Sequence, residues 1–131
     1  MSTFSLVSFD RRASLIMIPV TIKIGTGIAE YKFAVDTGAT FSLMDIDLLS
    51  DIGYKQKNCI RTLHTVTASG TETAYEFEID NIMAFGLIRR NFKIISHSLP
   101  PGLGIDGLLG LNFFKNKVLN IDFKLSEISL K

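Results

Sequence analysis

The sequence predicts a mostly-β domain, built as a closed sheet or a sandwich. Many short segments alternate between apolar and polar residues with a period of two, and residues typical of turns separate these segments. Candidate helices are few. The chain has 131 residues, of which 47% are hydrophobic and 21% charged. This length and composition are typical of one globular unit, so we expect residues 1–131 to form a single domain.

The first predicted strands precede position 36. An apolar run at residues 15–20 is expected to form the first strand, and residues 20–24 continue it with regular alternation. Gly25-Thr26-Gly27 then supplies a turn, and residues 31–35 return from it. The pattern therefore predicts an antiparallel hairpin near the start of the domain.

A second hairpin is predicted in the middle of the chain, with residues 62–68 and 73–79 as its arms. Its polar tip is Ser69-Gly70-Thr71, where Gly70 can adopt the positive φ that tight turns require. Three further segments read as strands, the first of them stopped by two prolines: residues 92–95, 118–123 and 127–130.

Residues 45–53 form the best candidate helix. Asp45 can cap its first turn, Gly53 is placed to end it, and three apolar residues share one face: Ile46, Leu49 and Ile52. Residues 111–114 are long enough for one further helical turn.

Charge and cysteine content exclude several functional classes. Lys and Arg number 14 and Asp and Glu 13, so the formal net charge of +1 argues against a nucleic-acid partner. The single cysteine, Cys59, can form neither a disulfide within the chain nor a zinc cluster, and a reducing, cytoplasmic location fits it best. No apolar stretch reaches the ~20 residues that span a bilayer. We expect no membrane association and no metal site.

The segment from Phe33 to Thr40 carries the clearest chemical signal. An apolar strand runs directly into Asp36, which Thr37 and Gly38 follow. Burying a carboxylate is costly unless it is hydrogen-bonded or shares a proton with another acid. Thr37 offers a hydroxyl, and Gly38 allows close approach of a backbone amide. The pattern favours a carboxylate that is held in place; the alternative is an ordinary turn with a solvated Asp36.

A second motif lies late in the chain: Asp106-Gly107-Leu108-Leu109-Gly110-Leu111-Asn112-Phe113-Phe114. With both motifs in this order, separated by a helix and a hairpin, residues 16–130 resemble the retropepsin-like aspartic proteases. The resemblance implies an all-β fold, namely a closed, barrel-like domain with a flap hairpin and one or two short helices.

The resemblance also implies roles for individual residues. Asp36 corresponds to the catalytic aspartate, and Leu43 and Leu108 match positions that line apolar substrate pockets. The active-site loop and the element beneath it supply supporting residues, namely Thr37, Gly38, Ala39, Leu109 and Gly110. The flap tip that closes over substrate corresponds to Ala68, Ser69, Gly70 and Thr71.

Catalysis by this family requires two carboxylates, and the chain has one Asp-Thr-Gly. Asp106 is a poor second acid, because Gly107 and Leu108 follow it without a hydroxyl where Thr37 stands. The second carboxylate is therefore expected from Asp36 of another copy, which predicts a C2 homodimer acting on a peptide or protein substrate. Water is the expected nucleophile, and no cofactor is needed.

The sequence departs from the retroviral pattern at two linked positions. Those enzymes commonly carry Asp where Thr40 stands and Arg where Leu111 stands, and the two residues form an ion pair near the dimer interface. With both absent, we expect the dimer to use terminal strands instead, such as residues 118–123 and 128–130.

Other functional hypotheses remain open. The same fold could be a non-catalytic peptide-binding or dimerisation module, or a monomer that needs a partner protein. Residues 102–107 match a dinucleotide-binding glycine pattern, but Pro100-Pro101 precede them and no βαβ unit surrounds them. The leading hypothesis is a dimeric aspartic endopeptidase that cleaves extended peptide segments.

Overall fold

The structure is a computed structural model that describes residues 5–131, apart from the side chains of Thr65 and Thr67. Its elements, in chain order, are β1 (Ser5–Ser8), β2 (Met17–Ile24), β3 (Gly27–Val35), β4 (Ser42–Asp45), α1 (Ile46–Asp51), the 3-10 helix η1 (Gln56–Asn58), β5 (Arg61–Thr67), β6 (Gly70–Ala84), β7 (Leu87–His97), β8 (Gly107–Leu109), α2 (Leu111–Phe114), β9 (Leu119–Asp122) and β10 (Glu127–Leu130).

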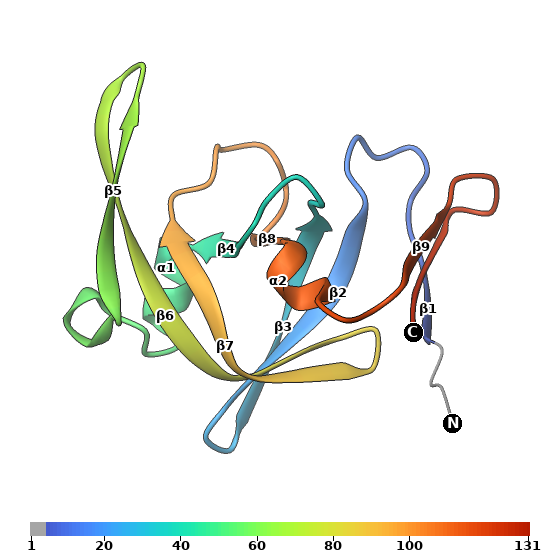
Figure 1. Cartoon of the computed structure of the whole chain (residues 1–131), viewed down its shortest axis with the longest axis horizontal. Coiled ribbons are helices and arrows are strands. Elements are labelled where there is room, and N and C mark those ends of the chain that lie inside the picture. Colours follow the sequence, from blue (N-terminus) through green and yellow to red (C-terminus); the bar gives the residue numbers. More distant parts are fainter. Residues whose placement is uncertain (1–4) are drawn as a thin grey trace.

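Strands β2, β3, β8, β4, β7 and β6 form a closed barrel (Figure 1). The ring closes where β2 pairs with β6, from Thr21 opposite Met83 to Lys23 opposite Asn81. Alternation along the strands points apolar side chains inward, where the most deeply buried include Ile18, Ile22, Phe33, Phe77, Ile79 and Ile94. The predicted closed sheet is confirmed.

β8 runs between β3 and β4, parallel to the first and antiparallel to the second. A glycine is required at this crossing. A Cβ on Gly107 would lie 2.5 Å from the carbonyl oxygen of Leu43 and 2.6 Å from the ring of Phe33. Gly107, in the late motif, therefore allows β8 to pass between β3 and β4 at a point where no side chain would fit.

The β5–β6 hairpin confirms the predicted pair of central arms. It extends beyond the barrel, and its two strands pair from Arg61 opposite Glu76 to Thr67 opposite Gly70. The turn is at residues 68–69, and Gly70 has the predicted positive φ, at +127°. β6 is much longer than the predicted arm, because it continues to Ala84 and turns back into β7.

The helices confirm the predicted caps. Asp45 Oδ1 accepts hydrogen bonds from the amides of Asp47, at 2.9 Å, and Leu48, at 3.3 Å. Gly53 follows the C-terminal end of α1 with a φ of +103°, and Leu49 is fully buried. α2 occupies the predicted residues 111–114.

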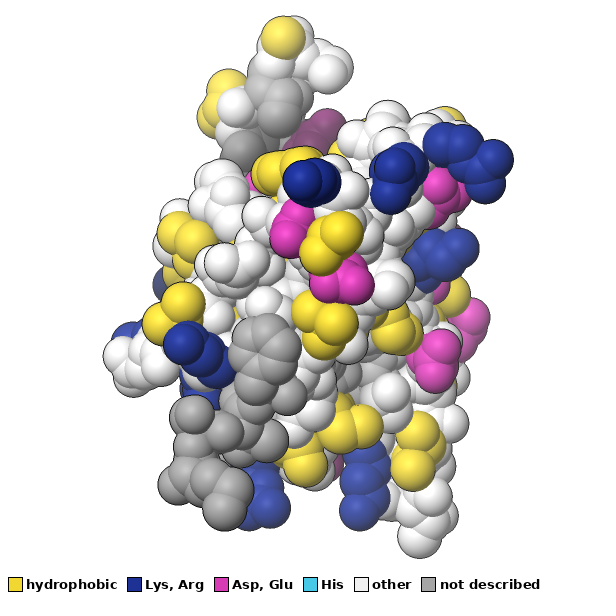
Figure 2. Space-filling model, turned by 90° about the vertical axis from the view of Figure 1, so that its right-hand side faces the viewer, with side chains coloured by type: hydrophobic (Ala, Val, Ile, Leu, Met, Phe, Trp, Pro, Cys, Tyr) yellow, Lys and Arg dark blue, Asp and Glu magenta, His cyan; other side chains and the backbone are white. Residues whose placement is uncertain are grey.

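The chain ends form a separate sheet in the order β1-β10-β9. Its outer face is seen in Figure 2, where apolar side chains lie among charged ones. β9 and β10 confirm the predicted last pair of strands, whereas β1 was not predicted and precedes the expected first strand. Within residues 5–131, no helix has the length and apolar character that crossing a membrane requires.

Candidate active site

Asp36 follows β3 directly and is fixed through three hydrogen bonds. Its amide donates to the carbonyl of Leu109, at 2.9 Å, and its own carbonyl accepts from the amide of Ala39, at 3.2 Å. Its carboxylate oxygen Oδ1 accepts from the amide of Gly38, at 3.0 Å. The residue is half-buried, whereas Thr37 and Gly38 are exposed. The carboxylate is thus held by its own turn, next to the exposed Thr37.

The segment from Leu109 to Leu111 supports this turn. The amide of Leu111 donates to the carbonyl of Ala39, at 2.8 Å. A Cβ on Gly110 would lie 2.5 Å from the carbonyl oxygen of Phe41 and 2.8 Å from that of Ala39. Leu109 and Gly110 therefore lie against the Asp36 loop.

A polar network that the sequence reasoning missed lies behind the loop. The amide and the hydroxyl of Ser42 both donate to Asn112 Oδ1, at 2.9 and 2.8 Å. The hydroxyl also accepts from the amide of Gly110, at 2.9 Å, and Asn112 Nδ2 donates to the carbonyl of Lys93, at 2.9 Å. In the sequence, the one feature that could have indicated this network is Ser42, a lone serine at the start of an apolar strand.

A row of side chains crosses the sheet outside the barrel core. Leu108 lies opposite Leu43, which lies opposite Ile95, and all three are partly exposed. The row continues to Glu76 and Arg61, which form an ion pair. Glu76 is buried, so its charge depends on Arg61 for compensation. The predicted pocket residues Leu43 and Leu108 therefore lie together on one accessible face.

The predicted flap residues do not meet Asp36 within one chain. Ala68, Ser69, Gly70 and Thr71 are exposed at the end of the β5–β6 hairpin. In Figure 1 this hairpin rises at one side, and its tip stands well apart from the loop that joins β3 to β4.

Asp106 is engaged by backbone groups. Its Oδ2 accepts from the amide of Lys32, at 2.8 Å, and its own amide donates to the carbonyl of Lys32, at 2.7 Å. This pairing extends the contact between β3 and the segment before β8. Asp106 therefore braces the barrel.

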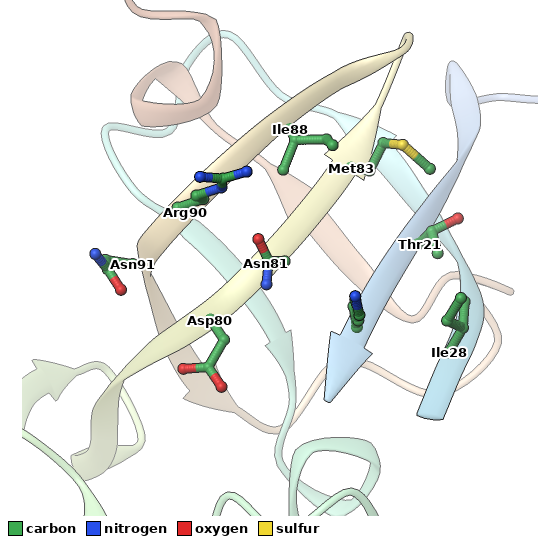
Figure 3. Close-up of a pocket in the computed structure, with 9 residues that line it drawn as sticks. Thr21, Ile28, Asp80, Asn81, Met83, Ile88, Arg90 and Asn91 are labelled. Carbon is green, nitrogen blue, oxygen red and sulfur yellow. The ribbon is translucent and has the colours of Figure 1, made fainter. Parts of the chain in front are cut away.

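A hollow of about 570 Å³ lies elsewhere, on the outer face where the β2–β3 and β6–β7 hairpins meet (Figure 3). Asp80 is the one carboxylate among its lining residues, so it offers no catalytic pair. In the described part of the chain, no three His, Cys, Asp or Glu side chains are grouped as a metal site would require.

Comparison with known proteins decides the family. A sequence profile described as aspartyl protease matches residues 18–113. The chain belongs to the aspartyl protease family. The match includes the Asp36 loop, the β5–β6 hairpin and β8, so the aspartyl protease profile covers every element of the candidate site described above. No curated protein sequence matches the chain.

Solved structures show the same fold at low sequence identity. A retropepsin-like aspartic protease from Rickettsia conorii has a TM-score of 0.70 and 18% identity, covering 98% of this chain and 90% of its own. The retroviral protease-like domain of Ddi1 from Leishmania major has a TM-score of 0.55 and 21% identity, covering 86% and 85%. EIAV protease in complex with the inhibitor HBY-793 has a TM-score of 0.57 and 14% identity, covering 84% and 93%. This member of the aspartyl protease family therefore has the retropepsin-like fold.

Proposed function

We propose that this protein is an aspartic endopeptidase that hydrolyses peptide bonds at a site shared by two copies of the chain. The observation that carries the proposal is the Asp36 carboxylate, held by the Gly38 amide at 3.0 Å on an accessible loop. The match to the aspartyl protease family supports the same reaction.

The chemistry requires two acids with different protonation states. One carboxylate takes a proton from water, while the other carboxyl group donates a proton to the carbonyl oxygen of the peptide. Two adjacent carboxylates cannot both ionise cheaply, so a pair of Asp36 groups would share one proton. The pair titrates as a unit, with macroscopic values that belong to neither copy alone.

The second acid comes from a partner copy in this proposal. Asp106, the acid nearest to the late motif, already accepts a hydrogen bond from the backbone of β3. Thr37 is exposed, and within the described part of the chain its hydroxyl has no partner. A C2 axis beside this loop would bring Asp36 and Thr37 against their copies.

The terminal sheet is a suitable part of the dimer interface. β10 pairs with β1 on one edge and with β9 on the other, so it has no edge left for a partner strand. β9 and β1 each pair on one edge only, within this sheet. Apolar side chains at or beside them are exposed, namely Leu6, Val118, Phe123 and Leu125. Of the two expected interface segments, 118–123 can therefore add a partner strand and 128–130 cannot.

The substrate would lie as an extended strand between the flap and the Asp36 pair. Backbone groups of the flap would hold its main chain, and the partly exposed Leu43 and Leu108 would contact apolar side chains. A specific alternative is a module that binds a peptide without cutting it.

Incubation with a varied peptide library at acidic and neutral pH tests the proposal. Cleavage by the wild type, and none by Asp36→Asn, is the expected result. The amide oxygen of Asn can still accept from the Gly38 amide, so folding and dimerisation should be nearly unchanged. Saturable peptide binding without any product that depends on Asp36 would favour the binding module. A monomer in sedimentation at high concentration would contradict the shared site.

A further inference from the structure

The outer part of the flap leaves the barrel at Tyr75. β6 pairs with β7 from Tyr75 opposite Ser96 to Ala84 opposite Leu87. Residues 70–74 continue β6, but the described pairings join them to β5 and not to β7. We call residues 61–74 the flap arm. Strand pairing therefore does not join residues 70–74 to β7, and side-chain contacts with the barrel can contribute to the position of the flap arm.

One such contact joins the flap arm to the end of β7. Glu72 lies two residues after Gly70, and its Oε2 is 2.8 Å from Nε2 of His97, the last residue of β7. The other ring nitrogen of His97, Nδ1, is 2.7 Å from the carbonyl oxygen of Ser98. The two side chains are partly exposed, His97 at 29% and Glu72 at 45%, so solvent protons can reach both.

Both contacts of His97 can be hydrogen bonds at the same time only when the ring is protonated. A carbonyl oxygen and a carboxylate oxygen can only accept hydrogen bonds, so both ring nitrogens must donate. Neutral imidazole has a single N–H, and only imidazolium has two. After loss of a proton, one ring nitrogen would present a lone pair to an acceptor. The Ser98 carbonyl is the next residue in the chain and stays in place, whereas Glu72 lies on an arm that can swing away.

Glu72 is the acid at hydrogen-bonding distance from His97, but other charges lie on the elements packed against β7. Asp45 is opposite His97 in the β4–β7 register, and its carboxylate caps α1. Glu76 is paired with Arg61. The remaining groups are Asp47 on α1, Asp106, which is bound to the Lys32 amide, and Lys93 on β7 itself. None of these groups offers Glu72 a replacement hydrogen bond in the structure.

We propose that His97 and Glu72 form an acid-dependent latch that fixes the position of the flap arm relative to the end of β7. His97 is also the residue from which the chain enters the 98–106 segment that leads to Leu108. The latch thus links the flap arm to the segment that leads to Leu108, a predicted substrate-pocket residue. This inference rests on the proposed function: His97 and Glu72 are positioning residues and do not touch the reacting atoms.

Hydrogen exchange of the flap-arm amides between about pH 5 and 8, the range in which histidine changes charge, tests the latch. The measurement uses the Asp36→Asn protein without substrate, so that the exchange rates do not depend on whether the protein cleaves peptides. After correction for the intrinsic pH dependence of exchange, protection of residues 61–74 should fall several-fold as the pH rises. An equal response in barrel strand β2 would indicate a general effect and overturn the latch.

Two substitutions at His97 and one matched control sharpen the test. His97→Gln should give low protection at every pH, and His97→Lys, which keeps a permanent cation, should restore protection that no longer varies with pH. His64→Gln is the control, because His64 lies on the flap arm and its ring contacts Thr73 of the same hairpin, at 3.5 Å. Loss of the pH response in His64→Gln, or its survival in His97→Gln, would overturn the proposal.

In the protein with Asp36 intact, His97→Gln should raise KM several-fold at pH 5 and leave kcat nearly unchanged, because the latch acts on the position of the flap arm and not on proton transfer. His97→Lys should recover the low KM. If no peptide is cleaved, the proposed function fails but the exchange result stands; if cleavage occurs and the exchange response is absent, only the latch fails.

Discussion

The side-chain oxygen of Asn112 accepts two hydrogen bonds from Ser42, one from its amide at 2.9 Å and one from its hydroxyl at 2.8 Å. These bonds tie α2 to the first residue of β4. Ser42 is fully buried, and its hydroxyl also receives the amide of Gly110. The loop that carries Asp36 joins β3 to β4. Asp36 lies at its start, so the Ser42–Asn112 pair fixes its other end, where β4 begins.

Ser42→Ala should lower the free energy of unfolding by about 1–3 kcal/mol, because it leaves the buried Gly110 amide and part of the Asn112 acceptor without partners. Urea denaturation measures the change. Ser14→Ala is the matched control, since Ser14 is exposed. Equal unfolding midpoints for the two variants would show that the network does not stabilise the fold.

Gly110→Ala should prevent folding or lower the free energy of unfolding by about 3 kcal/mol or more. The added Cβ would clash with backbone atoms, which cannot rotate away as a side chain can. Those atoms lie at 2.5–2.8 Å from the Cβ position. Gly27→Ala is the comparison, because the nearest atom to its Cβ is the carbonyl oxygen of Ile24, at 3.4 Å. Circular dichroism and urea denaturation should show a native-like Gly27→Ala protein. A Gly110→Ala protein of wild-type stability would contradict the close approach.

Tyr54 should destabilise the fold when it ionises. Burial raises the pKa of Tyr54 above the usual value for tyrosine, although a hydrogen bond from the backbone of Asp80 opposes the shift. The folded state thus retains the phenol proton to higher pH than the unfolded state, so the stabilisation is complete below pH 10 and is lost as the pH rises through the raised pKa. Wild type should therefore lose stability relative to Tyr54→Phe as the pH rises above about 10. Urea titrations across that range measure it, and a constant difference would be inconsistent with the shift.

The parts of the fold that the sequence predicted are those fixed by local chemistry. Asp45 caps α1, Gly70 takes a positive φ, and the Asp36 turn closes on Gly38, all within a few residues. β1 was missed because its partner is at the other end of the chain, where Ser5 lies opposite Leu130.

The full length of β6 and β7 was also missed. Polar residues at Asp80-Asn81 and Arg89-Arg90 interrupt the apolar alternation. The turn between the strands places Phe85 and Gly86 at φ +55° and +73°, and phenylalanine is not a residue that signals such a turn. The Ser42–Asn112 bond was beyond prediction for a related reason: its partners are 70 residues apart and meet only once the barrel has closed.

The most direct test of the central claim mixes wild type with Asp36→Asn at a fixed total concentration and allows the subunits to exchange fully. If each site needs Asp36 from two copies, mixed dimers are inactive and cleavage follows the square of the wild-type fraction, so an equal mixture retains about a quarter of the activity. Activity that falls in simple proportion to the wild-type fraction would mean that one chain suffices, and would contradict the shared site.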